Sequence, residues 1–107
     1  MKRGEVWLCA LDPTVGSEIQ KTRPCVIVSP DELNDRLRTV IVAPMTTGSR
    51  PAPFRVAVTL QGKTGLILLD QLRTVHRDRL IKLANTLESE TLKVVLRTIM
   101  ATFVEGR

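Results

Sequence analysis

Short apolar runs, separated by loops rich in proline, glycine and charge, occupy most of this sequence. Runs of this kind, rich in β-branched residues and bounded by turn formers, are typical of β-strands. The sequence predicts strands at Val6–Leu11, Cys25–Ser29, Thr39–Met45, Phe54–Thr59, Gly65–Leu69 and Gln71–Val75. Many short strands bury their apolar faces most readily in a strongly bent sheet, so the pattern favours a mainly β protein.

The period of the apolar residues changes near the C-terminus. The spacing of an amphipathic helix is shown by Leu92, Val95, Leu96, Ile99 and Phe103. Residues 88–90, Glu-Ser-Glu, supply a capping oxygen and negative charge for the start of that helix. The expected fold is a small SH3-like barrel of short, mostly antiparallel strands with a C-terminal helix. With 107 residues, the chain is expected to form one domain, 1–107.

Three connections carry local signals of their own. Pro30–Asp35 is expected to be a turn or a short helical connection, with acids after the proline. Gln61-Gly62-Lys63 predicts a hairpin turn between the strands on either side. Asp78–Ile81 predicts one helical turn with Asp78 as its N-cap.

The charge balance is basic. The chain has 16 Lys and Arg against 11 Asp and Glu, a net charge of +5 and a pI of about 9.9. This is the electrostatic character expected of a nucleic-acid binder, although many basic domains bind no polyanion. Aromatic residues are scarce, with Trp7, Phe54, Phe103 and no tyrosine. That scarcity disfavours a protein that binds single strands by serial base stacking.

The sequence also indicates a cellular setting. The apolar run after the basic N-terminus ends at Asp12-Pro13 and is too short for a signal peptide. Because no stretch is long enough to span a bilayer, we expect a cytoplasmic protein without a membrane partner. Cys9 and Cys25 each lie inside an apolar run and are expected to be buried, free thiols.

The residues available for chemistry are few. His76 is the sole histidine, no CxxC is present, and the acids are not clustered, so neither a metal site nor a cofactor is expected. Polar residues instead gather at strand ends. Arg23 closes the loop at 12–22, which contains Ser17 and Glu18, and Thr46 opens the loop at 46–53. If the second and third strands pair, Arg23 and Thr46 lie side by side; the alternative is a surface arginine and two turn residues.

Five segments of the chain resemble the MazF/PemK family of toxin endoribonucleases, in the family's order and spacing. They are RGEVW at 3–7, LDPTVGSE at 11–18, TRPCVIVSP at 22–30, VAPMTT at 42–47 and LLDQLRT at 68–74. The resemblance covers residues 3 to about 103.

The resemblance implies a fold, an assembly and a reaction. It implies an SH3-like barrel with a C-terminal helix that pairs as a homodimer. It further implies metal-independent cleavage of single-stranded RNA at short sequences, and neutralisation by a cognate antitoxin protein. The RNA 2′-hydroxyl attacks, leaving a 2′,3′-cyclic phosphate and a 5′-hydroxyl. Such chemistry needs a proton acceptor, positive charge for the phosphorane and a donor for the leaving oxygen.

Residue by residue, the resemblance implies roles for five positions. Arg23 matches the essential arginine of the MazF branch, and an arginine can meet two phosphate oxygens at once. Thr46 matches the threonine that acts with that arginine. Glu18 matches an acid implicated as a base, and Ser17 lies where a neighbouring RNA contact falls. Asp70 matches an aspartate proposed as catalytic in the PemK branch.

The PemK-type site is incomplete in this chain. That branch also uses an arginine two residues before the aspartate and a histidine in the first loop. Leu68 and Ser17 stand at those positions. The departures favour a MazF-type site and leave Asp70 either catalytic or structural.

Two other functions fit the same fold. A gyrase-binding toxin of the CcdB type depends on a C-terminal tryptophan-glycine segment, whereas this chain ends FVEGR and has its sole tryptophan at position 7. A non-catalytic RNA-binding barrel is the second alternative, and the presence of Arg23 and Thr46 argues against it.

Overall fold

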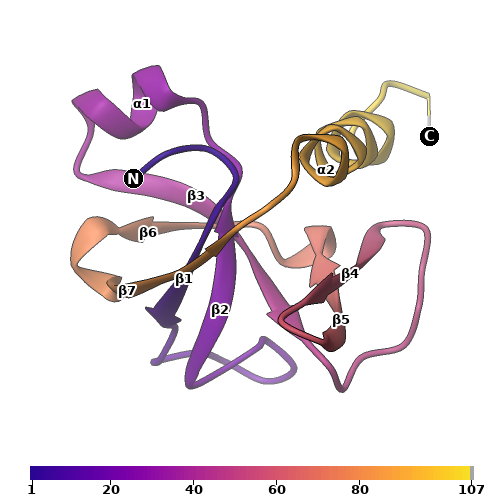
Figure 1. Cartoon of the computed structure of the whole chain (residues 1–107), viewed down its shortest axis with the longest axis horizontal. Coiled ribbons are helices and arrows are strands. Elements are labelled where there is room, and N and C mark those ends of the chain that lie inside the picture. Colours follow the sequence, from indigo (N-terminus) through magenta and orange to yellow (C-terminus); the bar gives the residue numbers. More distant parts are fainter. Residues whose placement is uncertain (107) are drawn as a thin grey trace.

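The computed structural model describes residues 1–106 and contains a curled antiparallel sheet with a long helix over one side (Figure 1). The strands are β1 (Glu5–Ala10), β2 (Thr22–Ile27), β3 (Thr39–Thr46), β4 (Arg55–Leu60), β5 (Lys63–Leu68), β6 (Arg73–His76) and β7 (Leu80–Thr86). The α-helices are α1 (Asp31–Arg36) and α2 (Ser89–Thr102), and short 3₁₀ helices occur at η1 (Leu69–Gln71) and η2 (Arg77–Arg79). Within the described residues, neither α-helix is long and apolar enough to cross a bilayer.

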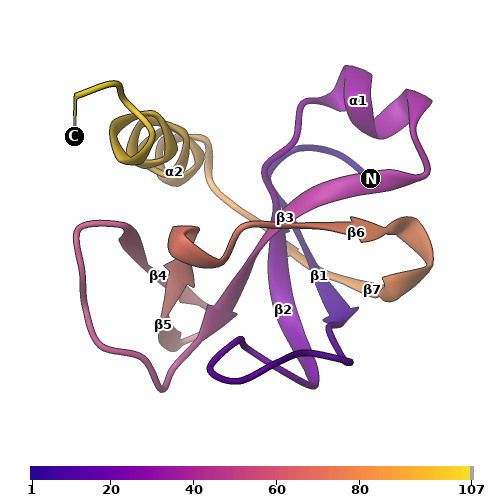
Figure 2. The ribbon, with the colours of Figure 1, turned by 180° about the vertical axis from the view of Figure 1, so that it is seen from behind.

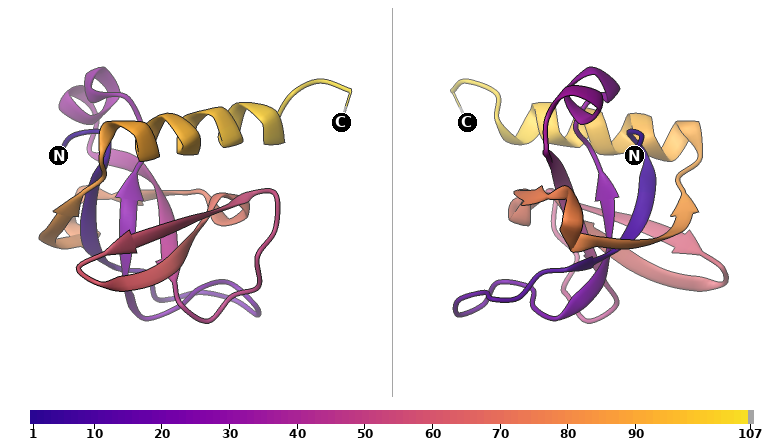
Figure 3. Two further views of the ribbon diagram at one scale, coloured as in Figure 1. Left: turned by 45° about the vertical axis from the view of Figure 1, so that its right-hand side comes forward. Right: turned by 90° about the vertical axis from the view of Figure 1, so that its left-hand side faces the viewer.

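Strand β3 is the centre of the sheet. The strand order is β4-β5-β3-β2-β1-β7, and β6 also pairs with β3. The start of β3 pairs with β6, and its end pairs with β5. Because one continuous strand takes part in both pairings, the sheet curls, and Figures 2 and 3 show the β4–β5 hairpin standing apart from β6 and β7. The predicted small barrel with a C-terminal helix is confirmed, as a half-barrel with β4 and β7 at its edges.

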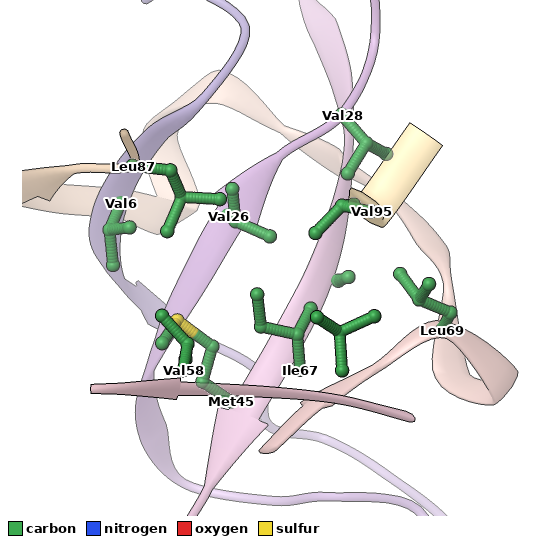
Figure 4. Packing of buried hydrophobic residues seen from close by; sticks show 11 residues of the cluster. Val6, Val26, Val28, Met45, Val58, Ile67, Leu69, Leu87 and Val95 are labelled. Carbon is green, nitrogen blue, oxygen red and sulfur yellow. The ribbon is translucent and has the colours of Figure 1, made fainter. Parts of the chain in front are cut away.

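The central strands bury apolar residues on both faces. One cluster lies under α2 and the β4–β5 hairpin and includes Val6, Val26, Val28, Met45, Ile67 and Val95 (Figure 4). The other lies toward β6 and β7 and includes Cys9, Cys25, Ile27, Val42 and Val75. Successive side chains of a strand point to opposite faces, so a strand between two clusters needs a continuous apolar run. This explains the CVI run that ends β2, whose three residues are all buried.

The hairpin between β4 and β5 has the predicted turn. Gln61 and Gly62 both adopt positive φ, at 51° and 78°. Two consecutive residues of this kind form a turn whose twist matches that of the flanking strands. Pro30–Asp35, for which the sequence left a turn or a short helix open, is helical: Pro30 is the N-cap of α1, and the next five residues belong to that helix.

The helical turn predicted at Asp78–Ile81 is wrong. The 3₁₀ helix η2 instead spans Arg77–Arg79 with His76 as its N-cap, and the His76 side chain accepts a hydrogen bond from the Asp78 amide at 3.1 Å. The chain then extends into β7, which the sequence pattern did not predict. Most side chains of β7 are exposed, and its pairing with β1 shifts register twice. A strand of this kind lacks the alternation of apolar residues by which strands are recognised.

The amphipathic face of α2 is confirmed except at its end. Val95 is fully buried, and Leu92, Leu96 and Ile99 are partly buried. Phe103, which was expected on the same face, is 69% exposed. It is the C-cap residue of α2 and lies beyond the cluster that the helix covers.

Candidate functional site

Strands β2 and β3 bring Arg23 and Thr46 to the same end of the sheet. Cys25 pairs with Pro44 in antiparallel register. Continuing that register along both strands puts Arg23 opposite Thr46. Both residues line one cavity of about 370 Å³, referred to here as the first cavity. The sequence predicted that the end of the loop at 12–22 (the first loop) lies close to the start of the loop at 46–53 (the second loop). The structure confirms this.

The first cavity lies between the two edges of the half-barrel. Its apolar lining comes from Val6, Leu8, Pro24, Met45, Val58 and Leu60, and its polar lining includes Gln61, Lys63, Thr64 and Asn85. Mostly apolar walls with a few convergent polar groups are the usual form of a ligand site. With the cations Arg23 and Lys63 also in its lining, the cavity is suited to an anion that carries a flat, partly apolar group.

Arg23 has unused hydrogen-bond donors. Its Nε donates to the backbone oxygen of Gln20 at 3.3 Å. Among the described residues, its two terminal nitrogens have no hydrogen-bond partner. Arg23 is half-buried. Its Nε is held by the loop, and its terminal nitrogens remain available to a ligand. A guanidinium held in this way can donate two parallel hydrogen bonds to a phosphate.

Thr46 carries a hydroxyl and lines the same cavity as Arg23. Its Oγ1 accepts a hydrogen bond from the Gly48 amide at 3.2 Å. A hydroxyl has one proton to donate and two lone pairs, so it remains free to act as a donor. Thr46 and Arg23 together can therefore bind oxygen atoms of one anion from two sides.

Glu18 does not line the first cavity. It lines a second cavity of about 200 Å³ together with Asp70, Gln71 and Arg73. One carboxylate oxygen of Glu18 accepts a hydrogen bond from the Val15 amide at 2.5 Å, within the same loop. The structure thus brings Glu18 and Asp70 together, separately from Arg23 and Thr46. Ser17, the remaining predicted site residue, is exposed in the loop.

Asp70 forms an ion pair with Arg55. Nε of Arg55 donates to Oδ1 of Asp70 at 3.2 Å, and Nη2 donates to Oδ2 at 3.0 Å. The hydrogen bonds to Asp70 raise the pKa of the Arg55 guanidinium. Arg55 also donates to the backbone oxygen of Arg50 and lies over the Phe54 ring. This arrangement gives Asp70 a structural part in holding the second loop, and its catalytic role stays a prediction.

The residue types that bind metals are dispersed. His76 is exposed at η2, and Cys9 and Cys25 are completely buried on neighbouring strands. Both cysteines are free thiols, as the sequence predicted. Hydrogen bonding with Cys9 and burial both raise the pKa of Cys25. Within residues 1–106, no group of three or more His, Cys, Asp and Glu side chains could hold a metal ion.

The buried thiols lead to a prediction about stability. Cys9→Ser and Cys25→Ser should each lower the free energy of unfolding by about 1–3 kcal/mol, because a hydroxyl replaces a thiol in an apolar site. Urea denaturation measures the change, and the matching Cys→Ala variants separate the hydroxyl's cost from the loss of volume. A serine variant that stays fully folded yet loses the RNA cleavage implied by the resemblance would contradict a structural role.

Sequence reasoning missed several residues around these cavities. Asn85 lies on β7, and because that strand was not predicted, its place in the first cavity was not predictable either. Lys63 was assigned to a turn and lies at the start of β5, inside the cavity lining. Gln71 was placed in a strand and instead ends η1, where it contacts the first loop.

A comparison with protein families places most of the chain in one of them. The model of a family described as "PemK-like, MazF-like toxin of type II toxin-antitoxin system" matches residues 2–103. Endoribonuclease PemK of Escherichia coli is 40% identical over 102 residues, covering 86% of this chain and 77% of that protein. Endoribonuclease MazF of Staphylococcus epidermidis is 38% identical over 101 residues, covering 88% and 84%.

Solved structures share the same fold. MazF from Deinococcus radiodurans superposes with a TM-score of 0.84 at 22% identity, covering 95% of this chain and 94% of that chain. An endoribonuclease in complex with its cognate antitoxin, from a mycobacterial species, has a TM-score of 0.80 at 24% identity, covering 94% and 92%. At these identities the likeness concerns the fold alone.

Proposed function

Because the chain belongs to the PemK-like, MazF-like toxin family of type II toxin–antitoxin systems, we propose that it is a sequence-specific endoribonuclease toxin. Its substrate is single-stranded RNA, including mRNA. The observation that carries the proposal is the position of Arg23 beside Thr46 in the lining of the first cavity. Residues 1–107 act as one toxin domain, and the site of action is the cytoplasm.

Arg23 and Thr46 are assigned to the scissile phosphate. The terminal nitrogens of Arg23 bind its non-bridging oxygens and stabilise the charge that builds up in the phosphorane. Thr46 donates its hydroxyl proton to the phosphate or bonds the attacking 2′-hydroxyl. The first cavity then receives an adjacent nucleotide, since its apolar walls suit a base and its polar groups suit the base edge.

The reaction uses a nucleophile that the RNA itself supplies. The 2′-oxygen forms a bond to phosphorus and gives up its proton, the bond from phosphorus to the 5′-oxygen breaks, and that oxygen takes a proton. The products are a 2′,3′-cyclic phosphate and a 5′-hydroxyl. In this scheme the positive charge comes from Arg23, and neither a metal ion nor a cofactor takes part in a step.

The two carboxylates near the site differ in their freedom to accept that proton. Both oxygens of Asp70 are engaged by Arg55. Glu18 uses one oxygen within its own loop, and the loop is exposed. We therefore propose Glu18 as the base, which requires the exposed loop at 12–22 to carry its carboxylate from the second cavity toward Arg23 and Thr46 when RNA binds. Asp70 is assigned to holding the loop at 46–53. Ser17, one residue before Glu18, is assigned as an RNA contact.

A cognate antitoxin is proposed as the protein partner. The net charge of +5 favours an acidic segment over the face that binds RNA. The endoribonuclease function is favoured over a CcdB-like gyrase-binding toxin and over a non-catalytic barrel, because the relatives named above are endoribonucleases.

A mixed RNA pool tests the proposed function. We expect the protein to cut at one short recurring sequence, with 5′-hydroxyl ends on the downstream fragments. Sequencing of the fragment ends gives the cut sites, and ligation methods that require a 5′-hydroxyl identify the chemistry. Random cut sites, or an intact pool under conditions where a PemK relative cuts, would contradict the proposal.

We also propose a homodimer. Large apolar side chains are exposed on and after α2, at Val94, Met100, Phe103 and Val104, and on β7 at Ile81 and Leu83. Large apolar side chains left exposed together on a helix and on an edge strand are candidates for an interface. At micromolar concentration, sedimentation equilibrium should give about twice the chain mass of 11.9 kDa. A mass equal to one chain would argue against the dimer.

A further inference from the structure

The tip of the loop between β1 and β2 is held mainly by bonds within itself. The Val15 amide donates to the Glu18 carboxylate, and the Glu18 amide donates to the Val15 oxygen at 3.2 Å. Val15 is 80% exposed, and Gly16 has a positive φ of 61°. The tip is therefore a small turn with little contact to the sheet. Its orientation must be set at the base of the loop.

At the outgoing side, two arginines bind the backbone as β1 ends. Nη1 of Arg79 donates to the oxygens of Ala10 at 2.9 Å and Asp12 at 2.7 Å. Nη1 of Arg73 donates to the oxygen of Leu11 at 2.8 Å. These bonds fix where the loop leaves the sheet.

On the returning side, the Leu11 amide donates to the backbone oxygen of Lys21 at 3.0 Å, and one side chain, that of Gln71, holds the residues before it. The amide of Ile19 donates to Oε1 of Gln71 at 2.8 Å. Among residues 1–106, this is the one hydrogen bond that joins residues 13–20 to any part of the chain beyond that loop and its flanking strands. Gln71 ends η1, which packs against β3 and is continuous with the Asp70–Arg55 pair.

The next residue links this contact to the site. The backbone oxygen of Gln20 accepts the hydrogen bond from Nε of Arg23 at 3.3 Å. Gln20 follows Ile19 directly. A bond that holds the Ile19 amide in place therefore also restricts the position of the Gln20 oxygen. That oxygen in turn restricts the plane of the guanidinium, whose terminal nitrogens remain free.

We propose that Gln71 is a positioning residue that orients Arg23 for cleavage, acting through the Ile19 amide and the Gln20 oxygen. The inference rests on the proposed function, in which Arg23 binds the scissile phosphate. Gln71 does not touch the RNA in this arrangement. It keeps the returning side of the loop, and with it the Nε partner of Arg23, in one place. Because the Ile19 side chain also packs against the second apolar cluster, loss of Gln71 loosens the loop without releasing it.

The test compares two substitutions at Gln71. Gln71→Leu keeps a similar volume and removes the acceptor, whereas Gln71→Glu keeps an acceptor oxygen for Ile19. For Gln71→Leu we expect kcat to fall about tenfold with little change in KM and in melting temperature, since small misplacements of a catalytic group cost this much or more. Gln71→Glu should keep kcat near that of the parent. Its added negative charge should raise KM for RNA instead.

A second measurement follows the contact without using activity. Hydrogen exchange should show the Ile19 amide protected in the parent and in Gln71→Glu, relative to the amides of Gly16 and Ser17. In Gln71→Leu the Ile19 amide should exchange faster. If Gln71→Leu does not fold, protection of Ile19 in the parent and in Gln71→Glu, with kcat retained in the latter, still supports the proposal.

Several results would overturn it. These are an unprotected Ile19 amide in the parent, parental kcat in Gln71→Leu, or equal losses of kcat in both variants. Absence of RNA cleavage by the parent itself would instead count against the proposed function, while the exchange data would still report on the Gln71–Ile19 contact.

Discussion

Arg23→Ala is expected to slow RNA cleavage by about 10²–10³-fold, the scale for removing one preorganised donor from the charge that develops in a transition state. The loss should lie mainly in the chemical step, because the phosphate gains charge as the phosphorane forms. Single-turnover cleavage of a labelled RNA at saturating enzyme isolates that step. The melting temperature should stay near that of the parent, since the Arg23 side chain makes a single hydrogen bond within the described protein.

Two controls make this result specific. Arg23→Lys should recover little of the rate, because an ammonium is a point charge and does not reproduce the two parallel bonds of a guanidinium. Arg36→Ala removes the same charge from α1, at the opposite end of the molecule from the loops (Figures 1 and 3). It should cut at the parental rate. An Arg23→Ala variant as fast as the parent, or an Arg36→Ala variant as slow as Arg23→Ala, would remove the argument for a local role.

The parts of the fold that were predictable are those with a local cause. The apolar run of β2 indicates burial on both faces of the strand. The Gln61-Gly62 pair indicates the turn between β4 and β5. Strand β7 has a different cause. Strand β7 forms because it pairs with the edge of β1. The side chains of β7 are mostly exposed, so its sequence does not indicate that pairing. The helical turn expected at Asp78–Ile81 has a separate cause: an acid before apolar residues resembles a helix N-cap.

In the site, too, features with a local cause were predictable and features that depend on distant residues were not. Arg23 and Thr46 were predictable because each lies at a strand end, and adjacent antiparallel strands place such ends together. The separation of Glu18 and Asp70 from Arg23 and Thr46 was not predictable, because residues outside the predicted helices and strands have no fixed period from which to judge the direction of a side chain. The Arg55–Asp70 pair and the Gln71–Ile19 bond join residues far apart in the sequence. The resemblance to the family marked Asp70, whereas Gln71 lies in the same matched segment and was given no role.

The second large effect concerns the substrate. An RNA in which one hydrogen replaces the 2′-hydroxyl at the cut site should bind nearly as well as the parent RNA, because its phosphate and bases are unchanged. It should remain uncut, because the nucleophile is missing. The unmodified RNA should be cut at the same rate with or without EDTA, since Arg23 supplies the positive charge in the proposed reaction.

The most direct test of the proposed reaction is therefore cleavage of this singly deoxy-substituted RNA beside its all-ribose parent, in EDTA, with binding measured in parallel. We expect equal binding of the two RNAs within about threefold, complete cleavage of the parent and no cleavage of the substituted RNA, because the attacking group is lost. Cleavage of the deoxy-substituted RNA at the same position would contradict attack by the 2′-hydroxyl and, with it, the role given to Arg23 and Thr46.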